Sequence, residues 1–194
     1  MPLVNLLPED GEVYYHGPVF TSAEAHRYFE QLLQDIAWEH DQAVIFGKTI
    51  VTRRKVAWYG DQAFPYTYSR ITRTALPWTP LLQALKARVE HLSKASFNAC
   101  LLNLYHEGSE GMAWHRDAEK ELQPGGVIAS LSFGAERRFS LKHRTQDTRI
   151  HQELAHGSLL IMQGETQRHW LHQLPTTKKV KTPRVNLTFR QMRT

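Results

Sequence analysis

The chain has 194 residues, of which 41% are hydrophobic and 22% are charged, and its formal net charge is +5 at pH 7. This length is typical of one compact domain, and the composition excludes collagen-like, low-complexity and disordered chains. A single cysteine, Cys100, excludes a disulfide framework and a cysteine-rich zinc site. No apolar run approaches the roughly 18 residues that a membrane span needs, and the acidic, proline-containing N-terminus is unlike a targeting segment. We therefore expect a monomeric cytoplasmic protein without membrane contacts, with the nucleoid or the nucleus as alternative locations.

Charge is distributed unevenly along the chain. Residues 1–42 contain eight acidic side chains and one basic side chain, a formal charge of −7, so the remainder carries +12. Beyond Glu165 there is no acidic residue, whereas seven lysines and arginines follow. Such asymmetry favours a polyanionic partner, nucleic acid above all. A solvated basic surface without a partner is the alternative.

Two amphipathic helices are predicted in the N-terminal half of the chain. Thr21 followed three residues later by Glu24 is typical of a capping box, and apolar residues then recur at helical spacing as far as Ala37. A second helix is predicted to begin at Thr79-Pro80, because proline favours the first helical position. Between the helices, residues 44–75 are predicted to be extended, since β-branched residues and tyrosines occur there among basic side chains.

Short strands dominate the chain from Phe97 onward. Apolar runs with glycine or proline close to most of them predict strands over residues 98–105, 127–133, 138–142, 158–162 and 185–190. In the last of these, apolar side chains alternate with side chains that form hydrogen bonds. The prediction is an α+β fold in which two helices pack on an antiparallel β-sandwich or barrel.

His115-Arg116-Asp117 is the most informative short motif. In an extended chain, side chains two residues apart point to the same face, so one imidazole and one carboxylate would converge. A third metal ligand is available downstream at His169 or His172. Two histidines and one carboxylate form the facial triad of non-haem Fe(II) oxygenases, which leaves positions open for a cosubstrate and O₂. Because the chain has 11 histidines, a surface pair that arose by chance is the alternative.

The polar face of the last predicted strand indicates an anionic ligand. Arg184 and Arg190 lie on one face of this strand, with Asn186 and Thr188 between them. Guanidinium groups favour carboxylate or phosphate partners. A dicarboxylate such as 2-oxoglutarate satisfies both arginines, with its keto-acid end on the metal and its far carboxylate on an arginine. Two solvent-facing basic residues on an edge strand are the alternative.

These motifs resemble those of the AlkB family, the Fe(II)- and 2-oxoglutarate-dependent nucleic-acid demethylases. The resemblance extends over residues 45–193 and is closest to the DNA-repair AlkB homologues of animals. It rests on Asn103-Leu104-Tyr105, His115-Arg116-Asp117, Leu154-Ala155-His156-Gly157-Ser158-Leu159-Leu160, His172 and Pro183-Arg184-Val185-Asn186-Leu187-Thr188-Phe189-Arg190. It implies a double-stranded β-helix (jelly-roll) core with flanking N-terminal helices, in a single domain over residues 1–194. Within this domain we expect an acidic helical part over 1–43, a nucleotide-recognition hairpin region over 44–75 and a catalytic β core over 97–194.

The resemblance also implies roles for individual residues. The implied Fe(II) ligands are His115, Asp117 and His172, a set that prefers His172 over His169. The residues implied to bind the cosubstrate 2-oxoglutarate are Asn103, Tyr105, Arg184, Asn186, Thr188 and Arg190. The two arginines would pair with its two carboxylates, and which arginine takes which end is left open.

The implied reaction is oxidative demethylation in DNA repair. An N-methyl group is oxidised with O₂ and leaves as formaldehyde, while 2-oxoglutarate is converted to succinate and CO₂. N1-methyladenine and N3-methylcytosine are the expected lesions, because a methyl group on the Watson–Crick edge weakens pairing and makes base flipping cheaper. The alternatives are an RNA or transfer-RNA base demethylase or hydroxylase, a protein or small-molecule hydroxylase, and a non-catalytic nucleic-acid-binding module.

The implied nucleic-acid contacts lie mostly within residues 44–75. Phe46 would fill the gap left by a flipped base, and a strand-end position in the core is its alternative. The candidate phosphate contacts are Arg53, Arg54 and Lys55, and the candidate base-pocket aromatics are Tyr66 and Tyr68. Ordinary strand packing would explain the two tyrosines equally well. Close relatives often have an acid where Ala118 stands, so Glu119 is the candidate contact to the base.

Overall fold

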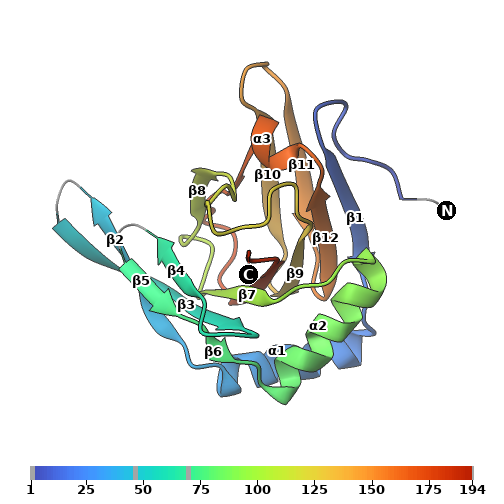
Figure 1. The fold of residues 1–194 in the computed structure, drawn as a ribbon. Coiled ribbons are helices and arrows are strands. Elements are labelled where there is room, and N and C mark those ends of the chain that lie inside the picture. Colours follow the sequence, from blue (N-terminus) through green and yellow to red (C-terminus); the bar gives the residue numbers. More distant parts are fainter. Residues whose placement is uncertain (1–2, 46–47, 69–70, 194) are drawn as a thin grey trace.

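The computed structural model describes residues 3–45, 48–68 and 71–193, and Figure 1 shows its ribbon. The elements in chain order are β1 (Glu12–Pro18), α1 (Ser22–Asp35), β2 (Glu39–Ile45), β3 (Lys48–Gly60), β4 (Pro65–Tyr68), β5 (Ile71–Thr74), β6 (Leu76–Pro77), α2 (Pro80–Ser93), β7 (Ala99–Tyr105), β8 (Met112–His115), β9 (Ile128–Gly134), β10 (Arg137–His143), β11 (Arg149–Leu154), β12 (Ser158–Gln163), α3 (Thr166–His169), β13 (Trp170–Leu174) and β14 (Arg184–Arg190). No helix in the described part of the chain combines the length and the apolar character that crossing a membrane requires.

Two sheets form a jelly-roll core. The larger, eight-stranded sheet has the order β1-β12-β9-β14-β7-β3-β2, with β6 paired to β3. The smaller, four-stranded sheet has the order β11-β10-β13-β8. Strands that are distant in sequence are therefore neighbours, as β7 and β14 are, and this is typical of jelly rolls. The prediction of an α+β fold with helices packed on an antiparallel β core is confirmed.

The larger sheet uses its two faces differently. One face packs against α1 and α2 and contributes Val185, Leu187 and Phe189 of β14 to a buried apolar cluster with the helices. The other face lies toward the smaller sheet, where Leu141 and Trp170 belong to a second buried cluster. In Figure 1, α1 and α2 lie side by side below the larger sheet. Because strand side chains alternate between faces, the polar side chains of β14 point into the space between the sheets.

The predicted helices form where the capping signals place them. The Thr21 hydroxyl accepts a hydrogen bond from the Glu24 backbone N–H at 3.3 Å, and the Glu24 carboxylate accepts one from the Thr21 N–H at 2.9 Å. The second helix begins at Pro80, and the Thr79 hydroxyl accepts from the Leu82 N–H at 3.3 Å. Both capping predictions are confirmed.

The structure adds strands that the hydrophobic pattern did not predict. The N-terminal 43 residues were expected to be helical, but residues 12–18 form β1, which pairs with β12 at the edge of the larger sheet. The smaller sheet contains three further unpredicted strands, β8, β11 and β13. On β11, every second side chain is exposed, and β13 has a histidine at one of its buried positions. Such strands show little apolar contrast, so tertiary pairing rather than local pattern forms them.

The described part of residues 44–75 is largely extended, as predicted, and forms the end of β2 and the strands β3, β4 and β5. β2 begins at Glu39, so residues 39–43 are a second stretch of the expected helical part that forms a strand instead. The residues of β3 from Lys55 to Gly60 pair with β7 in the larger sheet, and its first half pairs with β2 alone. Figure 1 shows β2 and β3 extending away from the core, beside the small sheet of β4 and β5. Phe46 and the side chains of Tyr66 and Tyr68 lie outside the described part of the structure.

Candidate active site

A cavity of about 100 Å³ lies between the two sheets. The smaller sheet contributes His115 from β8 and His172 from β13, which are direct partners in the strand register. The larger sheet contributes polar side chains from β7 and β14. The residues of the predicted site that line the cavity are Asn103, Tyr105, His115, Asp117, Glu119, His172, Arg184, Asn186, Thr188 and Arg190. The fold thus brings the metal motif and the arginine motif into one cavity.

His115, Asp117 and His172 form a group that could hold a metal ion. One potential ligand atom from each side chain lies within 4.8 Å of the others. The β8 strand ends at His115, so Asp117 lies just beyond the extended segment on which the sequence argument relied. The two residues nevertheless converge, because the Gln167 side-chain oxygen accepts a hydrogen bond from the Asp117 N–H at 2.9 Å.

The protonation of both histidines suits a metal. His115 Nδ1 lies 2.8 Å from the Ala113 carbonyl oxygen, and since a carbonyl only accepts, Nδ1 carries a hydrogen and Nε2 is the ring nitrogen left to bind a metal. This is the usual arrangement of metal-binding histidines. Burial, together with the charge of His115, lowers the pKa of His172 to about 3. His172 is therefore neutral at physiological pH and able to donate its lone pair.

Asp117 is held as a carboxylate. Burial opposes its ionisation, but the Arg190 guanidinium, with smaller contributions from His172 and His115, keeps the pKa of Asp117 below its usual value. The Arg190 Nη2 and Asp117 Oδ2 atoms are 3.0 Å apart, and both side chains are buried. A negative oxygen ligand therefore lies beside two imidazole nitrogen ligands, and this donor set suits Fe(II).

A second group of possible ligands consists of Asp10, which precedes β1, His143 at the end of β10 and His169 in α3. His143 Nδ1 accepts a hydrogen bond from the Gln146 backbone N–H at 3.1 Å. The hydrogen of a neutral His143 is therefore on Nε2, which lies 3.3 Å from Asp10 Oδ2. This Nε2 has no hydrogen-bond partner among the described residues, so its contact with Asp10 is an ion-pair distance without hydrogen-bond geometry. Because His169 belongs to this group, His172 is the histidine that joins His115 and Asp117.

Arg184 is buried in the cavity wall without a carboxylate partner among the described residues. Its Nη2 donates to the Ser132 hydroxyl at 2.9 Å and to the Asn186 side-chain oxygen at 3.1 Å, whereas its Nε has no partner there. Burial lowers the pKa of Arg184 to about 10, so the side chain stays charged at pH 7. A buried cation whose Nε lacks a hydrogen-bond partner among the described residues fits a ligand with a carboxylate.

Two residues of this site were missed by sequence reasoning. Ser132 alternates with Ser130 on β9, and both are buried, so polar alternation within a predicted strand was the available signal. Gln167 lies in the four-residue helix α3, 50 residues from Asp117, and no sequence pattern links the two.

The structure separates the candidate phosphate contacts. The Arg53 side chain is 71% exposed and forms ion pairs with Glu107 at 3.4 Å and Glu110 at 3.8 Å. Arg54 points the other way, is buried, pairs with Asp41 and donates to the Gly111 carbonyl at 3.3 Å. A buried, paired arginine does not reach a phosphate on the surface, so the expectation for Arg54 is wrong. Glu119 is half-buried and lines the cavity.

Comparison with known proteins agrees with this geometry. A family model described as the 2OG-Fe(II) oxygenase superfamily matches residues 11–190. The chain is 40% identical over 185 residues to the DNA oxidative demethylase ALKBH2 of Mus musculus, covering 90% of this chain and 77% of that protein. It is 42% identical over 176 residues to the alpha-ketoglutarate-dependent dioxygenase alkB homolog 3 of Homo sapiens, covering 86% and 61%. "The structure of OsALKBH1" superposes with a TM-score of 0.65 at 18% identity, covering 98% of this chain and 100% of that one, and supports the fold alone.

The chain therefore belongs to the 2OG-Fe(II) oxygenase superfamily, whose members use Fe(II), 2-oxoglutarate and O₂. Within that superfamily its identity to the ALKBH2 and alkB homolog 3 proteins places it in the AlkB family. The protein is accordingly an Fe(II)- and 2-oxoglutarate-dependent dioxygenase.

Proposed function

We propose that this protein repairs DNA by removing N-alkyl groups, such as those of N1-methyladenine and N3-methylcytosine. The observation that carries the proposal is the single cavity that joins the His115, Asp117 and His172 cluster to the buried Arg184 guanidinium. The choice of DNA as substrate is supported by the names of the ALKBH2 relatives. The same proposal includes a monomeric protein that acts on a base flipped out of the helix. Its location would be the cytoplasm, with the nucleoid or the nucleus as alternatives.

Each part of the cavity has a distinct task in this proposal. His115, Asp117 and His172 hold Fe(II), and Arg190 keeps Asp117 ionised across their 3.0 Å contact. Because Arg190 lies beside an iron ligand, we assign it to the keto-acid end of 2-oxoglutarate and Arg184 to the far carboxylate. Hydrogen bonds to the cosubstrate come from Asn103, Tyr105, Asn186 and Thr188.

When bound together, Fe(II) and 2-oxoglutarate would supply the oxidation of an N-methyl group by O₂, with release of formaldehyde, succinate and CO₂. The protein positions the methyl group and limits water in the cavity. Phe139, Met162 and Leu174 form apolar parts of its wall. The half-buried Glu119 carboxylate is a candidate partner for the exocyclic amine of a cationic methylated base.

Recognition of the nucleic acid is assigned to residues 44–75. Arg53 is exposed on β3 and serves as a phosphate contact in this proposal. Phe46 fills the gap left by the flipped base, and Tyr66 and Tyr68 stack on the base, as the resemblance implies.

The test is demethylation of oligonucleotides that contain one N1-methyladenine or N3-methylcytosine, with Fe(II) and 2-oxoglutarate added. The wild-type protein should release succinate and restore the normal base, as measured by mass spectrometry. His115→Ala and Asp117→Ala should abolish both products without unfolding the protein. His26→Ala, on the exposed surface of α1, is the matched control and should remain active.

Two results would contradict the proposal in different ways. Full activity of His115→Ala or Asp117→Ala would remove the metal site. Phosphate contacts alone do not distinguish DNA from RNA, so the two polymers have to be compared directly. Equal or faster turnover of the matching methylated RNA would overturn the choice of DNA.

A further inference from the structure

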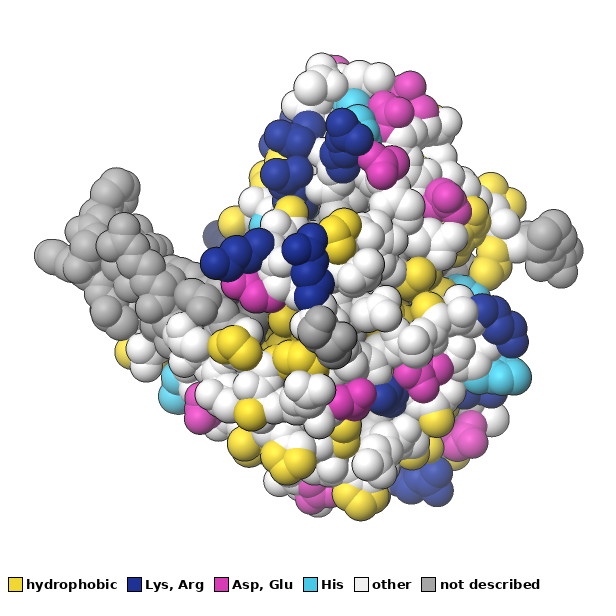
Figure 2. Space-filling model, in the orientation of Figure 1, with side chains coloured by type: hydrophobic (Ala, Val, Ile, Leu, Met, Phe, Trp, Pro, Cys, Tyr) yellow, Lys and Arg dark blue, Asp and Glu magenta, His cyan; other side chains and the backbone are white. Residues whose placement is uncertain are grey.

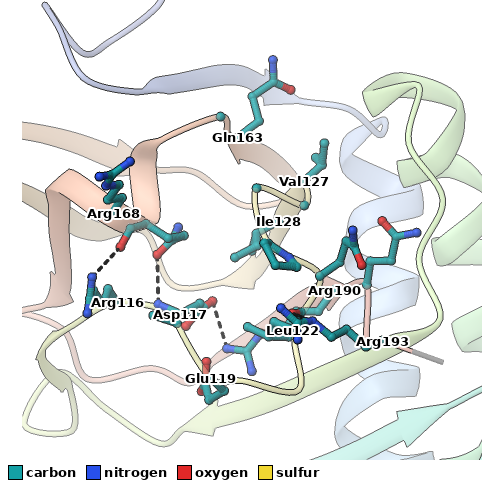
Figure 3. A pocket seen from close by; sticks show the side chains of 18 of the residues that line it. Arg116, Asp117, Glu119, Leu122, Val127, Ile128, Gln163, Arg168, Arg190 and Arg193 are labelled. Atoms are coloured by element: carbon teal, nitrogen blue, oxygen red, sulfur yellow. Dashed lines mark hydrogen bonds and ion pairs between the residues drawn. The ribbon is translucent and has the colours of Figure 1, made fainter.

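A second, larger recess adjoins the active site. It has a volume of about 290 Å³ and lies under the segment that links β8 to β9, between α3 and the C-terminal residues. Figure 3 shows this recess with Asp117 and Arg190 in its wall. Arg116, Asp117, Glu119 and Arg190 line both cavities. The recess is therefore an immediate neighbour of the iron site, separated from it by the Asp117–Arg190 ion pair.

The rim of the recess is cationic. Arg116, Arg168 and Arg193 line it, and Figure 3 shows Arg193 on the opposite side from the other two. Arg116 donates to the Gln167 carbonyl at 3.3 Å, and Arg193 donates to the Leu122 carbonyl at 3.1 Å. Neither of these two forms an ion pair with any residue that the structure describes, whereas Arg168 pairs with Glu165 at 3.1 Å, outside the lining of the recess. Backbone carbonyls thus hold the Arg116 and Arg193 guanidinium groups in place without neutralising them, which leaves their charge available to an anion.

The floor of the recess is apolar. Leu122 and Ile128 line it and are 8% and 5% exposed. An apolar floor below a rim of arginines suits a ligand that combines an anionic group with a flat, poorly hydrated body. A nucleotide is such a ligand, since arginines pair with its phosphate and its base packs on apolar or guanidinium surfaces.

We propose that the recess binds the nucleotide next to the alkylated one, with its two flanking phosphates at Arg168 on one side and Arg193 on the other, and with the sugar or base against Leu122 and Ile128. This inference rests on the proposed function, because the recess shares a wall with the cavity that would hold the flipped base. A nucleotide in the recess would therefore be a neighbour of that base in the nucleic acid. It assigns a substrate contact to the segment after β8, outside the recognition region of residues 44–75.

The test compares substrates with and without a neighbouring nucleotide. Wild-type protein, Arg193→Gln and Arg168→Gln are assayed on the nucleoside 1-methyl-2′-deoxyadenosine and on a single-stranded pentanucleotide with the same base at its centre. Each substitution should raise KM for the pentanucleotide by about tenfold, the loss expected for one charge-assisted hydrogen bond. Turnover of the nucleoside should not change. Arg27→Gln, on α1 and outside both cavities, removes the same charge elsewhere and should alter neither value.

Two outcomes overturn the inference. One is an unchanged KM for the pentanucleotide in both arginine variants, and the other is an equal loss on the nucleoside, which would mean that these arginines act through the iron site. Affinity for the pentanucleotide is also measured by fluorescence anisotropy, which does not depend on catalysis and so tests the recess separately from the proposed function. An inactive wild-type protein would contradict demethylation, whereas the same affinity in the wild type and both variants would remove the recess as a nucleotide site.

Discussion

At the scale of the residue, Arg184 carries a full charge in the interior without a carboxylate beside it among the described residues. Neutral acceptors on Ser132 and Asn186 compensate only part of the desolvation cost of a guanidinium. Such an arrangement lowers stability unless an anion completes it. The cost is understandable if a carboxylate of 2-oxoglutarate occupies the cavity during each turnover.

Replacing this charge tests that role. Arg184→Gln should raise KM for 2-oxoglutarate by about 10- to 100-fold, because a hydrogen bond between charged groups is lost. The measurement is the rate of succinate formation as a function of 2-oxoglutarate concentration. Arg138→Gln is the control, since Arg138 is exposed and pairs with Glu153 at 2.8 Å outside the cavity. An unchanged KM in Arg184→Gln would contradict the assignment.

At the scale of the element, the short helix α3 positions two of the three metal ligands. It leads directly into β13, which carries His172. Its Gln167 side chain accepts the hydrogen bond from the Asp117 N–H, and its backbone at the same residue accepts one from Arg116. The segment after β8 has little regular structure, so these contacts fix where Asp117 lies.

Removing the acceptor on α3 should therefore loosen the metal site. We expect Gln167→Leu to weaken Fe(II) binding about tenfold, the lower end of the effect of groups that orient metal ligands. Gln167→Glu keeps an acceptor oxygen and should bind Fe(II) more tightly than Gln167→Leu. Metal titration under anaerobic conditions gives the affinities, with the exposed Gln31→Leu on α1 as control. Equal affinity in Gln167→Leu and the wild type would show that α3 does not position Asp117.

The strands of the recognition region are joined by buried charges. Asp41 on β2 pairs with Arg54 on β3 and lies 3.6 Å from Arg73 on β5. Arg54 also donates to the Gly111 carbonyl at 3.3 Å, next to the start of β8. The cluster therefore connects the hairpin to the strand that carries His115.

Breaking this cluster should be costly. Asp41→Asn should lower the free energy of unfolding by about 3 kcal/mol, because it leaves buried cations without their counter-charge. Urea unfolding measures the change. The double variant Asp41→Leu with Arg54→Met should recover much of the loss, since it removes both charges. A loss below about 0.5 kcal/mol in Asp41→Asn, which is typical of surface substitutions, would mean that the pair does not join these strands.

At the scale of the whole molecule, the charge asymmetry of the sequence has a spatial counterpart. The acidic N-terminal part includes α1, which covers the outer face of the larger sheet, away from the cavity between the sheets. Figure 2 shows lysine and arginine side chains gathered over the region of α3 and β8, beside the active site. A polyanion is thus attracted to the side on which the chemistry occurs.

This separation predicts a strong dependence of binding on salt. The affinity for a methylated oligonucleotide should fall steeply between about 50 and 200 mM NaCl, because each phosphate contact releases counterions. Fluorescence anisotropy at several salt concentrations gives the slope. A nearly flat response would argue against recognition through phosphates.

Local pattern alone was sufficient for α1 and α2, for the strands with clear alternation and for the polar face of β14, because capping and alternation act over a few residues. It did not predict the four-residue helix α3. It was insufficient where two nearby residues of the same type could each fill one role and the sequence pattern did not distinguish them. Arg53 and Arg54 are adjacent on one strand and point to opposite faces, and only packing decides which face is buried. Spacing left His169 and His172 open as the third ligand, and the pairing of β13 with β8 sets His172 opposite His115. The hydrogen bond between Gln167 and Asp117 was also not predictable from local pattern. Contacts between segments that are distant in sequence depend on how the two sheets pack together, and no short stretch of sequence determines that packing.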